Sequence, residues 1–488
     1  MKKIIENIDK KVLAKTVERC RERNIIVPTF EEMRHPDKIP EKIKKKLKGV
    51  GFWDVNPINL FRITWRNDPK TELYGDVNTF EIPSEITGVK ARIIGMVGKY
   101  FPTGAHKVGA AFGCLAPRLV SGSFDPTTQK AVWPSTGNYC RGGAFDGTLL
   151  GCTSVAILPE EMSRERFDWL KSIGAEIIAT PGCESNVKEI YDACWDIRKN
   201  RKDCVIFNQF DEFGNPIWHY HVTAKAIEEH FGTLSNKQKR LSGFVSATGS
   251  AGTIGAGDYL KKVSPSLKIA ASEALQCPTL LLNGFGGHRI EGIGDKHVPW
   301  VHNSRNTDMV VAIDDEDCMR LLRLFNEPSG HKVLKSRGVS DEVIKNLNLM
   351  GISSISNLVS AVKMAKYYEM DENDVIYTMF TDSAEMYTSR VIEEREKHGE
   401  YGEIRGNCDL ESCLYAADKS NLKELSYYDR KAIHNLKYFT WVEQQGKESK
   451  DLNELWKPET WDSIFAQVSE WDDLIREFND MTGLLKAL

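Results

Sequence analysis

Pro102-Thr103-Gly104-Ala105-His106-Lys107-Val108-Gly109 is the stretch on which the fold and the chemistry of this chain depend. It places a lysine directly after a turn that contains glycine, at the start of an expected helix that continues with Ala110, Ala111 and Phe112. Small and apolar neighbours favour a partly desolvated amine, and burial lowers the pKa of a lysine so that its neutral form becomes available for bonding to a carbonyl. The plain alternative is a solvated lysine at a helix start.

Strands and helices alternate on both sides of this turn. A strand with alternating apolar residues is expected at 89–97, followed by strands at 130–134, 153–158, 176–180, 204–208, 243–247, 268–273 and 374–380. Helices are expected between them at 163–173, 187–199, 224–231, 258–263 and 315–325, with a long one that ends near 368. This order predicts an α/β fold whose parallel-rich sheets are flanked by helices, with ligands at the carboxyl ends of the strands.

Length and charge narrow the class of protein. The 488 residues are enough for two or three compact units, and the formal net charge of -4 gives no electrostatic reason to expect a nucleic acid or an anionic membrane as partner. No apolar run reaches the roughly 18 residues of a membrane helix. We therefore expect a cytoplasmic protein that acts on a small metabolite.

Two groups of residues could suggest a metal site, and both are declined. Cys408 and Cys413 are not spaced as C-x-x-C, and no second pair follows. His219-Tyr220-His221 has no third ligand in view, and residues two apart point to different sides of a helix. No metal is expected, and the eleven cysteines are expected to be reduced.

Glycine-rich loops follow several of the expected strands. Gly249-Ser250-Ala251-Gly252-Thr253 precedes a helix, where consecutive backbone amides can form a nest for an anion such as phosphate. The loop matches neither G-x-G-x-x-G nor the P-loop, so a tight turn without a ligand remains an alternative. Ser135-Thr136-Gly137-Asn138 and the glycine-punctuated segment 286–299 are further loops of this kind.

The order of these features resembles the fold type II pyridoxal-phosphate enzymes, most of all cysteine synthase and cystathionine β-synthase. The resemblance covers roughly residues 90–395 and includes Asn208-Gln209-Phe210, Asn215-Pro216, residues 288–294, Gly351-Ile352-Ser353-Ser354 and Asp382-Ser383. It implies a two-domain, tryptophan synthase β-like architecture, with a smaller domain at 90–215 and a larger one at 216–394. Residues 1–89 would form an N-terminal extension and residues 395–488 a helical C-terminal extension.

The resemblance also implies roles for single residues. Lys107 would hold pyridoxal 5'-phosphate as an internal aldimine and then shuttle the α-proton of the substrate. The other expected cofactor ligands are Asn138 at the 3′-oxygen, Gly249, Ser250, Ala251, Gly252 and Thr253 at the phosphate, and Ser353 at the pyridine nitrogen. The expected ligands of the substrate carboxylate are Ser135, Thr136, Gly137, Tyr139 and Gln209.

Some residues depart from the pattern of cysteine synthase. The string Thr103-Gly104-Ala105-His106-Lys107 is similar to the lysine motif of the tryptophan synthase β-subunit, but Ser135 stands where that family has an acidic residue, which disfavours tryptophan synthesis. Tyr139 replaces a small hydroxyl residue. Arg141 follows it, either as a solvated residue at a helix start or as the receptor for a second acidic group of the substrate.

The expected function is pyridoxal-phosphate-dependent β-replacement on a serine- or cysteine-like amino acid through an aminoacrylate, as in cysteine synthase. The alternative on the same fold is a β-elimination lyase or deaminase of the cysteine desulfhydrase or serine/threonine dehydratase type. A remoter alternative is a non-catalytic protein that binds a phosphometabolite at residues 249–253. The resemblance further implies a homodimer.

Overall fold

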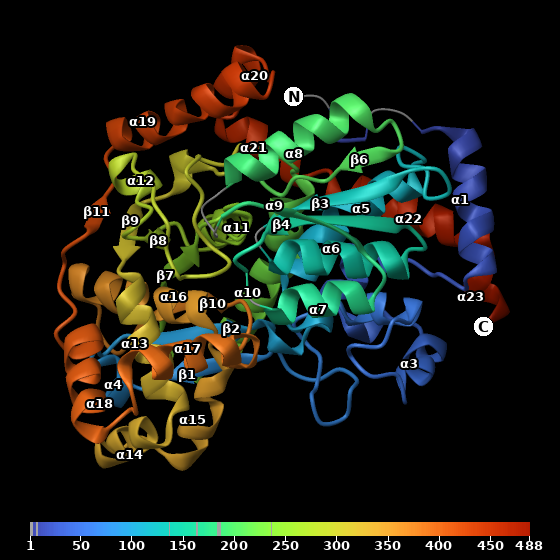
Figure 1. Ribbon diagram of the computed structural model, residues 1–488. Helices are drawn as coiled ribbons and strands as arrows, with labels where there is room; N and C mark the ends of the chain where they lie inside the picture. The colour runs from blue at the N-terminus through green and yellow to red at the C-terminus, as the bar shows by residue number, and fades with distance from the viewer. Residues whose placement is uncertain (1–2, 6–7, 136, 163, 183–186, 236) are drawn as a thin grey trace.

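In the computed structural model, two β-sheets organise the chain. The structure describes residues 3–5, 8–135, 137–162, 164–182, 187–235 and 237–488. A four-stranded sheet lies in the right half of the view in Figure 1 and a seven-stranded sheet in the left half. The expected α/β class, with parallel-rich sheets and helices, is confirmed.

The smaller sheet is entirely parallel, with the strand order β5-β4-β3-β6. Its strands are β3 (Lys130–Pro134), β4 (Thr153–Pro159), β5 (Glu176–Thr180) and β6 (Cys204–Ile206). Helices α6 (Asn138–Leu149), α7 (Arg164–Ser172) and α8 (Val187–Asn200) connect consecutive strands. Parallel strands need such crossovers, and all four strands match the predicted segments to within a few residues.

The larger sheet has the order β1-β2-β10-β7-β8-β9-β11. Its predicted strands are β2 (Arg92–Val97), β7 (Arg240–Ala247), β8 (Lys268–Ala274) and β10 (Asp374–Phe380), which pair in parallel. The sheet also contains β1 (Thr79–Ile82), β9 (Met309–Ile313) and β11 (Leu422–Glu424), which were not predicted. Strands β1 and β11 are short, antiparallel edge strands. β1 pairs with β2, which follows it closely in the chain, whereas β11 is defined by its pairing with the distant strand β9 rather than by a local pattern.

Strand β2 connects the lysine turn to the larger sheet. It lies within the segment 90–215 that we assigned to the smaller domain, yet it pairs with β10 and β1. Its backbone groups therefore complete the ladder of the larger sheet. The chain then passes through the turn at Pro102–Gly104 into α5 (Lys107–Val120), which packs against α6 and α9 (Gly214–Trp218). Lys107 thus opens a helix that joins the two halves of the molecule.

Further helices surround the sheets. Helix α16 (Ile352–Tyr367) packs against β7, β8, β9 and β10, and α11 (Ile254–Val263) follows the glycine loop at 249–253. The remaining helices of the central region are α4 (Ser84–Thr87), α10 (Ala224–Thr233), α12 (Thr279–Leu282), α13 (Asp315–Asn326), α14 (Pro328–Ser336), α15 (Asp341–Asn346) and α17 (Thr388–His398).

The two ends of the chain pack against each other. Helices α22 (Val468–Thr482) and α23 (Leu484–Ala487) run beside α1 (Lys10–Glu22) at the right edge of Figure 1. Asp472 of α22 accepts hydrogen bonds from the backbone N–H groups of Phe30 (2.6 Å) and Glu31 (3.1 Å) at the start of α2 (Phe30–Arg34). The helix-rich character expected for the C-terminal extension is confirmed, and that extension also covers the N-terminal segment.

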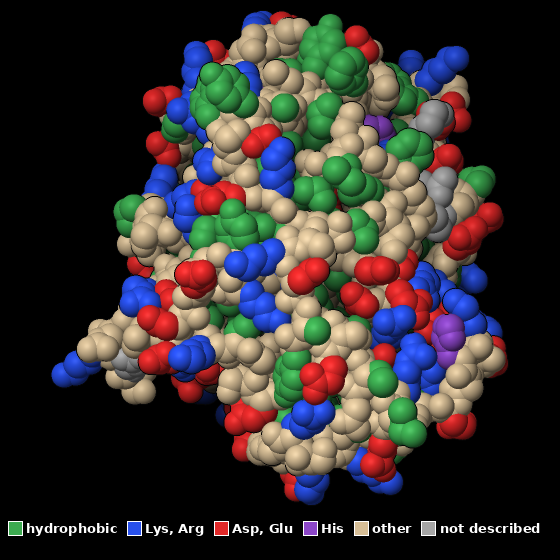
Figure 2. All heavy atoms as spheres, turned by 90° about the vertical axis from the view of Figure 1, so that its left-hand side faces the viewer, with side chains coloured by type: hydrophobic (Ala, Val, Ile, Leu, Met, Phe, Trp, Pro, Cys, Tyr) green, Lys and Arg blue, Asp and Glu red, His purple; other side chains and the backbone are tan. Residues whose placement is uncertain are grey.

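The other helices of these extensions are short. They are α3 (Glu41–Leu47), α18 (Glu403–Leu410), α19 (Tyr427–Lys437), α20 (Ser449–Glu454) and α21 (Pro458–Phe465). Over the face drawn in Figure 2, Lys and Arg side chains are interspersed with Asp and Glu side chains. Within the described residues, no helix is both long and apolar enough to cross a bilayer.

Candidate active site

The lysine turn has a backbone that only a few residues adopt easily. Thr103 and Gly104 both have positive φ angles, of 70° and 69°. A Cβ atom on Gly104 would lie 2.9 Å from the ring of Trp53, which covers the turn from the N-terminal extension. Two consecutive left-handed residues reverse the chain tightly, so that a short turn connects strand β2 to helix α5.

The amine of Lys107 lies among neutral polar groups. Its Nζ donates to Oε1 of Gln209 (3.2 Å) and to Oγ of Ser250 (3.3 Å). Burial lowers the pKa of Lys107 from 10.5 to about 8, and within the described residues no carboxylate lies within ion-pair distance of it. The neighbouring His106 is fully buried, and burial lowers its pKa to about 3. At pH 7 about a tenth of Lys107 is therefore the neutral amine, and this fraction grows as the pH rises towards 8, as expected for a desolvated lysine.

The loop between β3 and α6 faces this amine. Oγ of Ser135 accepts hydrogen bonds from the backbone N–H of Gly137 (3.2 Å) and from Nε2 of Gln209 (3.2 Å). A Cβ on Gly137 would coincide with the guanidinium of Arg166, only 1.3 Å from Nη1. Thr136, a predicted substrate ligand, lies outside the described residues. The absence of a Cβ at Gly137 thus leaves the space in which the guanidinium of Arg166 packs against this loop.

Asn138 connects the two sheets. As the first residue of α6, it donates from Nδ2 to Oδ2 of Asp382 (2.7 Å), which directly follows β10 and Thr381. Tyr387 donates to the same carboxylate oxygen (2.7 Å), and Arg166 in turn donates to the Tyr387 hydroxyl (3.3 Å). Burial raises the pKa of Asp382, and the charge of Arg166 opposes the shift. Oδ1 of Asn138 is buried and has no hydrogen-bond partner among the described residues, so it can still accept a bond from a ligand.

The glycine loop forms an open nest of backbone amides. Within the described residues, none of the N–H groups of residues 249–253 donates to a protein acceptor, and α11 begins immediately afterwards. Ala251 has a positive φ angle of 58°, which curls the loop. A Cβ on Gly252 would lie 1.9 Å from Oδ1 of Asn215. Consecutive free amides at a helix N-terminus bind an anion such as phosphate.

Ser250 joins this nest to the lysine. Its Oγ accepts hydrogen bonds from Nζ of Lys107 (3.3 Å) and from Nδ2 of Asn215 (3.0 Å). Asn215 also donates to the backbone carbonyl of Gln209 (3.0 Å). The segment 208–216, the glycine loop and the lysine are therefore parts of one hydrogen-bonded unit.

The structure brings most of the predicted site residues to one small cavity. It is lined by Lys107, Ser135, Asn138, Tyr139, Gln209, Phe210, Gly249, Ser250, Gly292, Ile293 and Gly294. The last three belong to the glycine-punctuated segment, where a Cβ on Gly294 would lie 2.2 Å from Nε2 of His288. These residues come from five separate segments: the start of α5, three segments that follow the strands β3, β6 and β7, and the segment 292–294 beyond α12.

Two predicted ligands differ in their surroundings: Tyr139 lines the cavity, whereas Ser353 is not among the lining residues. The Tyr139 ring packs edge-on against Trp133 (5.6 Å between centroids), and burial together with the nearby thiol of Cys114 raises the pKa of its hydroxyl. Ser353 is buried in the first turn of α16, next to Gly351, whose N–H donates to the backbone carbonyl of Asp382 (3.0 Å). Within the described residues, no hydrogen bond links the Ser353 hydroxyl to the cavity.

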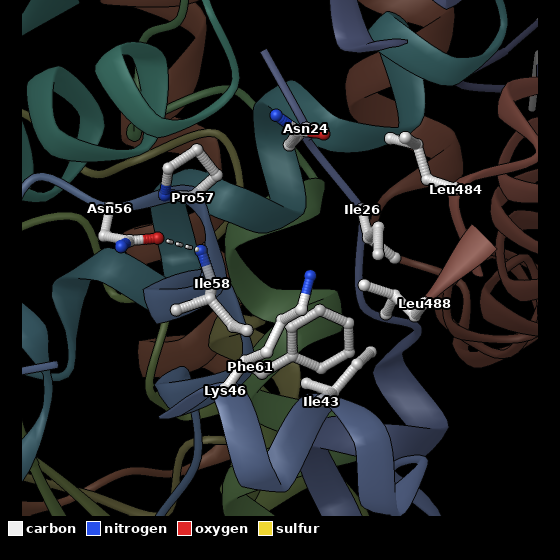
Figure 3. A pocket seen from close by; sticks show the side chains of 10 residues that line it. All are labelled: Asn24, Ile26, Ile43, Lys46, Asn56, Pro57, Ile58, Phe61, Leu484 and Leu488. Carbon is white, nitrogen blue, oxygen red and sulfur yellow. Dashed lines mark hydrogen bonds between the residues drawn. The ribbon is translucent and has the colours of Figure 1, made fainter. Parts of the chain in front are cut away.

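A larger cavity lies far from this chemistry. It measures about 410 Å³ between the N-terminal extension and the last helix, and Figure 3 shows Lys46 reaching from α3 towards its centre. Ile26, Ile43, Ile58, Phe61, Leu484 and Leu488 form most of its wall. Lys46 is the one titratable side chain in the wall of this cavity, so it offers no acid–base pair for catalysis.

Asp382 and Arg166 are site residues whose roles the sequence did not predict. The pair Asp382-Ser383 was noted only as part of the resemblance. Arg166 lies on α7, 29 positions after Gly137, and no local pattern signals that its guanidinium supports the Ser135–Asn138 loop. Both act across elements that the fold alone brings together.

The chain matches the model of the family described as pyridoxal-phosphate dependent enzyme over residues 98–336. It is 28% identical to cystathionine beta-synthase of Saccharomyces cerevisiae over 325 residues, which are 63% of this chain and 59% of that protein. It is also 28% identical to a probable cysteine synthase of Bacillus subtilis over 289 residues, which are 59% of this chain and 85% of that protein. The chain thus spans less than two thirds of the length of the yeast protein.

Solved structures share the fold. O-Acetyl Serine Sulfhydrylase isoform 3 from Entamoeba histolytica superimposes with a TM-score of 0.58 at 23% identity, over 71% of this chain and 98% of that one. A hydrogen sulfide-producing enzyme from Fusobacterium nucleatum superimposes with a TM-score of 0.54 at 26% identity, over 65% of this chain and 88% of that one. The chain therefore carries a pyridoxal-phosphate dependent enzyme domain of fold type II.

The residues around the cavity fit this cofactor. The free amides of residues 249–253 suit its phosphate, and Oδ1 of Asn138 is a buried acceptor without a protein partner. The depressed pKa of Lys107 supplies the neutral amine that bonds to an aldehyde. The phosphate, the 3′-oxygen and the aldehyde of the cofactor thus each have a matching group at this cavity, whereas Ser353, the residue expected at the pyridine nitrogen, is not among the lining residues.

Proposed function

We propose that this enzyme catalyses β-replacement on a serine- or cysteine-like amino acid, in the manner of cysteine synthase. The observation that carries the proposal is the 3.3 Å contact between Nζ of Lys107 and Oγ of Ser250, because it places the reactive amine against the anion nest. The names of the curated relatives, cystathionine beta-synthase and probable cysteine synthase, support the same type of reaction.

Bound pyridoxal phosphate would supply the electron-withdrawing ring that makes the α-proton of an amino acid acidic. In the proposed mechanism, the amides of residues 249–253 would hold its phosphate and Lys107 would hold its aldehyde. Asn138 is held by Asp382, so its amide plane is fixed towards the cavity. We further propose that Ser353 faces the pyridine nitrogen.

The side chains and backbone of the protein would then bind the substrate and move its α-proton. Nζ of Lys107 would accept the α-proton, because its lowered pKa keeps part of the amine neutral near pH 7.5. Ser135, the amide of Gly137 and Gln209 would hold the substrate carboxylate, and Thr136 and Tyr139 complete the proposed set. Ser135 and Gln209 hydrogen-bond each other, which holds both side chains at the cavity. The N–H of Gly137 donates to Ser135 in this structure and would exchange that bond for one to the carboxylate.

β-Elimination is the second candidate function. It is supported by the 26% sequence identity between this chain and the Fusobacterium nucleatum enzyme that is described as hydrogen sulfide-producing. Both reactions remove a group from the β-carbon. They differ in whether a nucleophile adds afterwards or the product is released as pyruvate and ammonia.

An assay of product type separates the two reactions. The purified, cofactor-saturated enzyme is incubated with O-acetylserine, serine or cysteine, with and without sulfide, while cysteine and pyruvate are measured. β-Replacement predicts cysteine from O-acetylserine and sulfide, with sulfide suppressing pyruvate. Pyruvate formation that sulfide leaves unchanged would establish elimination instead.

We also propose that the enzyme is a cytoplasmic homodimer and that residues 90–215 and 216–394 form its two domains, as the family resemblance implies, with strand β2 of the first segment completing the sheet of the second. Sedimentation equilibrium of the full chain measures its mass directly. A mass of about 55 kDa at micromolar concentration would contradict the dimer, because the chain itself has a mass of 55.2 kDa.

A further inference from the structure

Arg141 is a buried cation on α6, the helix whose first residues Asn138 and Tyr139 line the candidate active site; Arg141 itself is not among the lining residues. It lies one helical turn after Asn138 on α6, and residues three apart on a helix share a face. Only 2% of its surface is exposed, so it is not a solvated residue at a helix start. The second alternative of the sequence analysis, a receptor for an additional acidic group, is compatible with this burial.

The surroundings of Arg141 are aromatic rather than acidic. Its guanidinium lies 4.8 Å from the ring centre of Trp169 and 5.7 Å from that of Trp53. Nη1 approaches Sδ of Met386 at 3.6 Å, and Nε is buried without a hydrogen-bond partner among the described residues. Burial, together with the charge of Arg166, lowers the pKa of Arg141 to about 10. The side chain thus has a strong need for an anion.

The neighbouring carboxylates are already engaged by other groups. Glu291 pairs with Arg166 (3.3 Å) and with Arg390 (2.7 Å). Asp382 accepts hydrogen bonds from Asn138 and Tyr387. Within the described residues, Arg141 has no carboxylate at ion-pair distance. A buried guanidinium without a counter-ion costs several kcal/mol, and two aromatic faces offset only part of that cost.

We propose that Arg141, supported by Arg166, receives an anionic group carried by the substrate beyond its β-carbon. This inference rests on the proposed β-replacement and names its substrate class: serine derivatives whose leaving group is a phosphate or a carboxylate-bearing acyl group. Asn138 and Arg141 share one face of α6, so a substrate whose α-carboxylate binds at the Ser135–Asn138 loop could place its distal anion towards Arg141. Trp53 and Trp169 would then enclose that end of the substrate.

The reaction on such a substrate is balanced without an oxidant or a reductant. With O-phosphoserine and hydrosulfide, the Cβ–O bond breaks and its electron pair leaves with the phosphate, while the sulfur forms the new Cβ–S bond. The proton of hydrosulfide is transferred to the departing phosphate, giving cysteine thiolate and hydrogen phosphate. An O-succinylserine substrate would release succinate in the same way.

The first test compares kcat/KM for O-phosphoserine, O-succinylserine and the neutral O-acetylserine. We expect at least one anionic substrate to be preferred, and Arg141→Met to lower that preference about 10- to 100-fold, because hydrogen bonds to a charged group contribute about 1.5–3 kcal/mol. Arg141→Lys keeps the charge and should restore part of it. The matched control is Arg164→Met, which removes an 86% exposed arginine from the adjacent helix α7.

Two kinetic results would overturn the proposal: a wild-type enzyme that uses O-acetylserine at least as well as both anionic substrates, or Arg141→Met lowering all three rates equally. Melting temperature and cofactor absorbance show whether each variant is folded. An activity-independent measurement uses inorganic phosphate on the cofactor-saturated enzyme, whose own phosphate site is filled. Phosphate should raise the melting temperature of the wild type and of Arg164→Met, but not of Arg141→Met.

Failure of this inference is distinguishable from failure of the proposed function. If no serine derivative gives a replacement product, the β-replacement proposal is wrong, while the phosphate measurement still decides whether Arg141 binds an anion. Equal stabilisation of all variants by phosphate would reject the anion site.

Discussion

Asn138 on α6 donates a 2.7 Å hydrogen bond to Asp382, which follows β10, so one side-chain contact joins the smaller sheet to the larger one beside the reactive lysine. Asp382→Ala removes the acceptor for both Asn138 and Tyr387. We expect kcat/KM to fall at least tenfold, with a smaller loss in Asp382→Asn, which keeps one acceptor oxygen. A double-mutant cycle with Asn138→Ala should give a coupling of about 0.5–3 kcal/mol in the free energy of unfolding. If the two substitutions had additive effects on the free energy of unfolding, the contact between Asn138 and Asp382 would contribute nothing to stability.

Lys107→Ala is predicted to abolish both the bound-cofactor absorbance in the visible range and the activity. In the proposed mechanism Lys107 forms the covalent attachment and moves the α-proton, and solvent can replace neither role, so we expect a loss of at least about 1,000-fold. Absorbance spectra and steady-state rates measure the two effects. Lys10→Ala, at an exposed position of α1, is the matched control. A coloured, active Lys107→Ala enzyme would overturn the assignment of the catalytic lysine.

The depressed pKa of Lys107 predicts the pH dependence of its reactivity in the cofactor-free enzyme. Because the pKa is lowered from 10.5 to about 8, the neutral fraction should rise with pH, reach one half near pH 8 and level off above pH 9. Labelling with an amine-selective reagent, resolved by mass spectrometry, measures this rate. Exposed Lys10 in the same sample corrects for the pH dependence of the reagent. A rate still rising steeply above pH 10 would contradict a desolvated amine.

Gly252→Ala tests the glycine loop. The added Cβ would lie 1.9 Å from Oδ1 of Asn215, so either the loop or Asn215 must move, and the hydrogen bond from Asn215 to Ser250 would be disturbed. We expect the dissociation constant for pyridoxal phosphate to rise at least tenfold. Gly232→Ala in α10 has nothing within 4 Å of the new Cβ and should be neutral or stabilising by up to about 1 kcal/mol. Unchanged cofactor affinity in Gly252→Ala would argue against phosphate binding at this loop.

Lys437 of the C-terminal extension is bonded to Trp300 and His302, which directly follow the glycine-punctuated segment 286–299. Its buried Nζ donates to the backbone carbonyls of Trp300 (3.0 Å) and His302 (2.6 Å). Lys437→Met leaves both carbonyls without this donor, so the free energy of unfolding at pH 7 should fall by about 1–3 kcal/mol. Urea unfolding measures it, with the exposed Lys419→Met as control.

The same residue predicts a pH effect of known sign. Burial lowers the pKa of Lys437 from 10.5 to about 7. Between these values the unfolded chain binds a proton that the folded chain does not, so this group makes the protein more stable as the pH rises from 7 to 10.5. The stability difference between wild type and Lys437→Met should therefore increase from pH 7 to pH 9. A difference that shrinks over this range would show that Lys437 stays charged when folded.

The regular elements were largely predictable because each carries a local signal. The apolar runs of β3 and β4 and the glycines before α11 show in the sequence itself. Strand β11 has only three residues and forms because β9 offers its edge, so no local pattern could reveal it. The same limit applies to β2, whose place in the larger sheet depends on β10, nearly 300 positions later.

By itself, the sequence determined the reactive lysine turn, the glycine loop and the order of the motifs, because turn geometry and anion nests depend on neighbouring residues. Tertiary structure alone decided that Asp382 holds Asn138, that Arg166 lies against Gly137 and that Arg141 is buried between two tryptophans. These contacts join residues that are far apart in the chain, and burial rather than residue type sets their pKa values and their need for partners. The lysine turn therefore indicates the cofactor, while the folded surroundings of Arg141 point to the substrate.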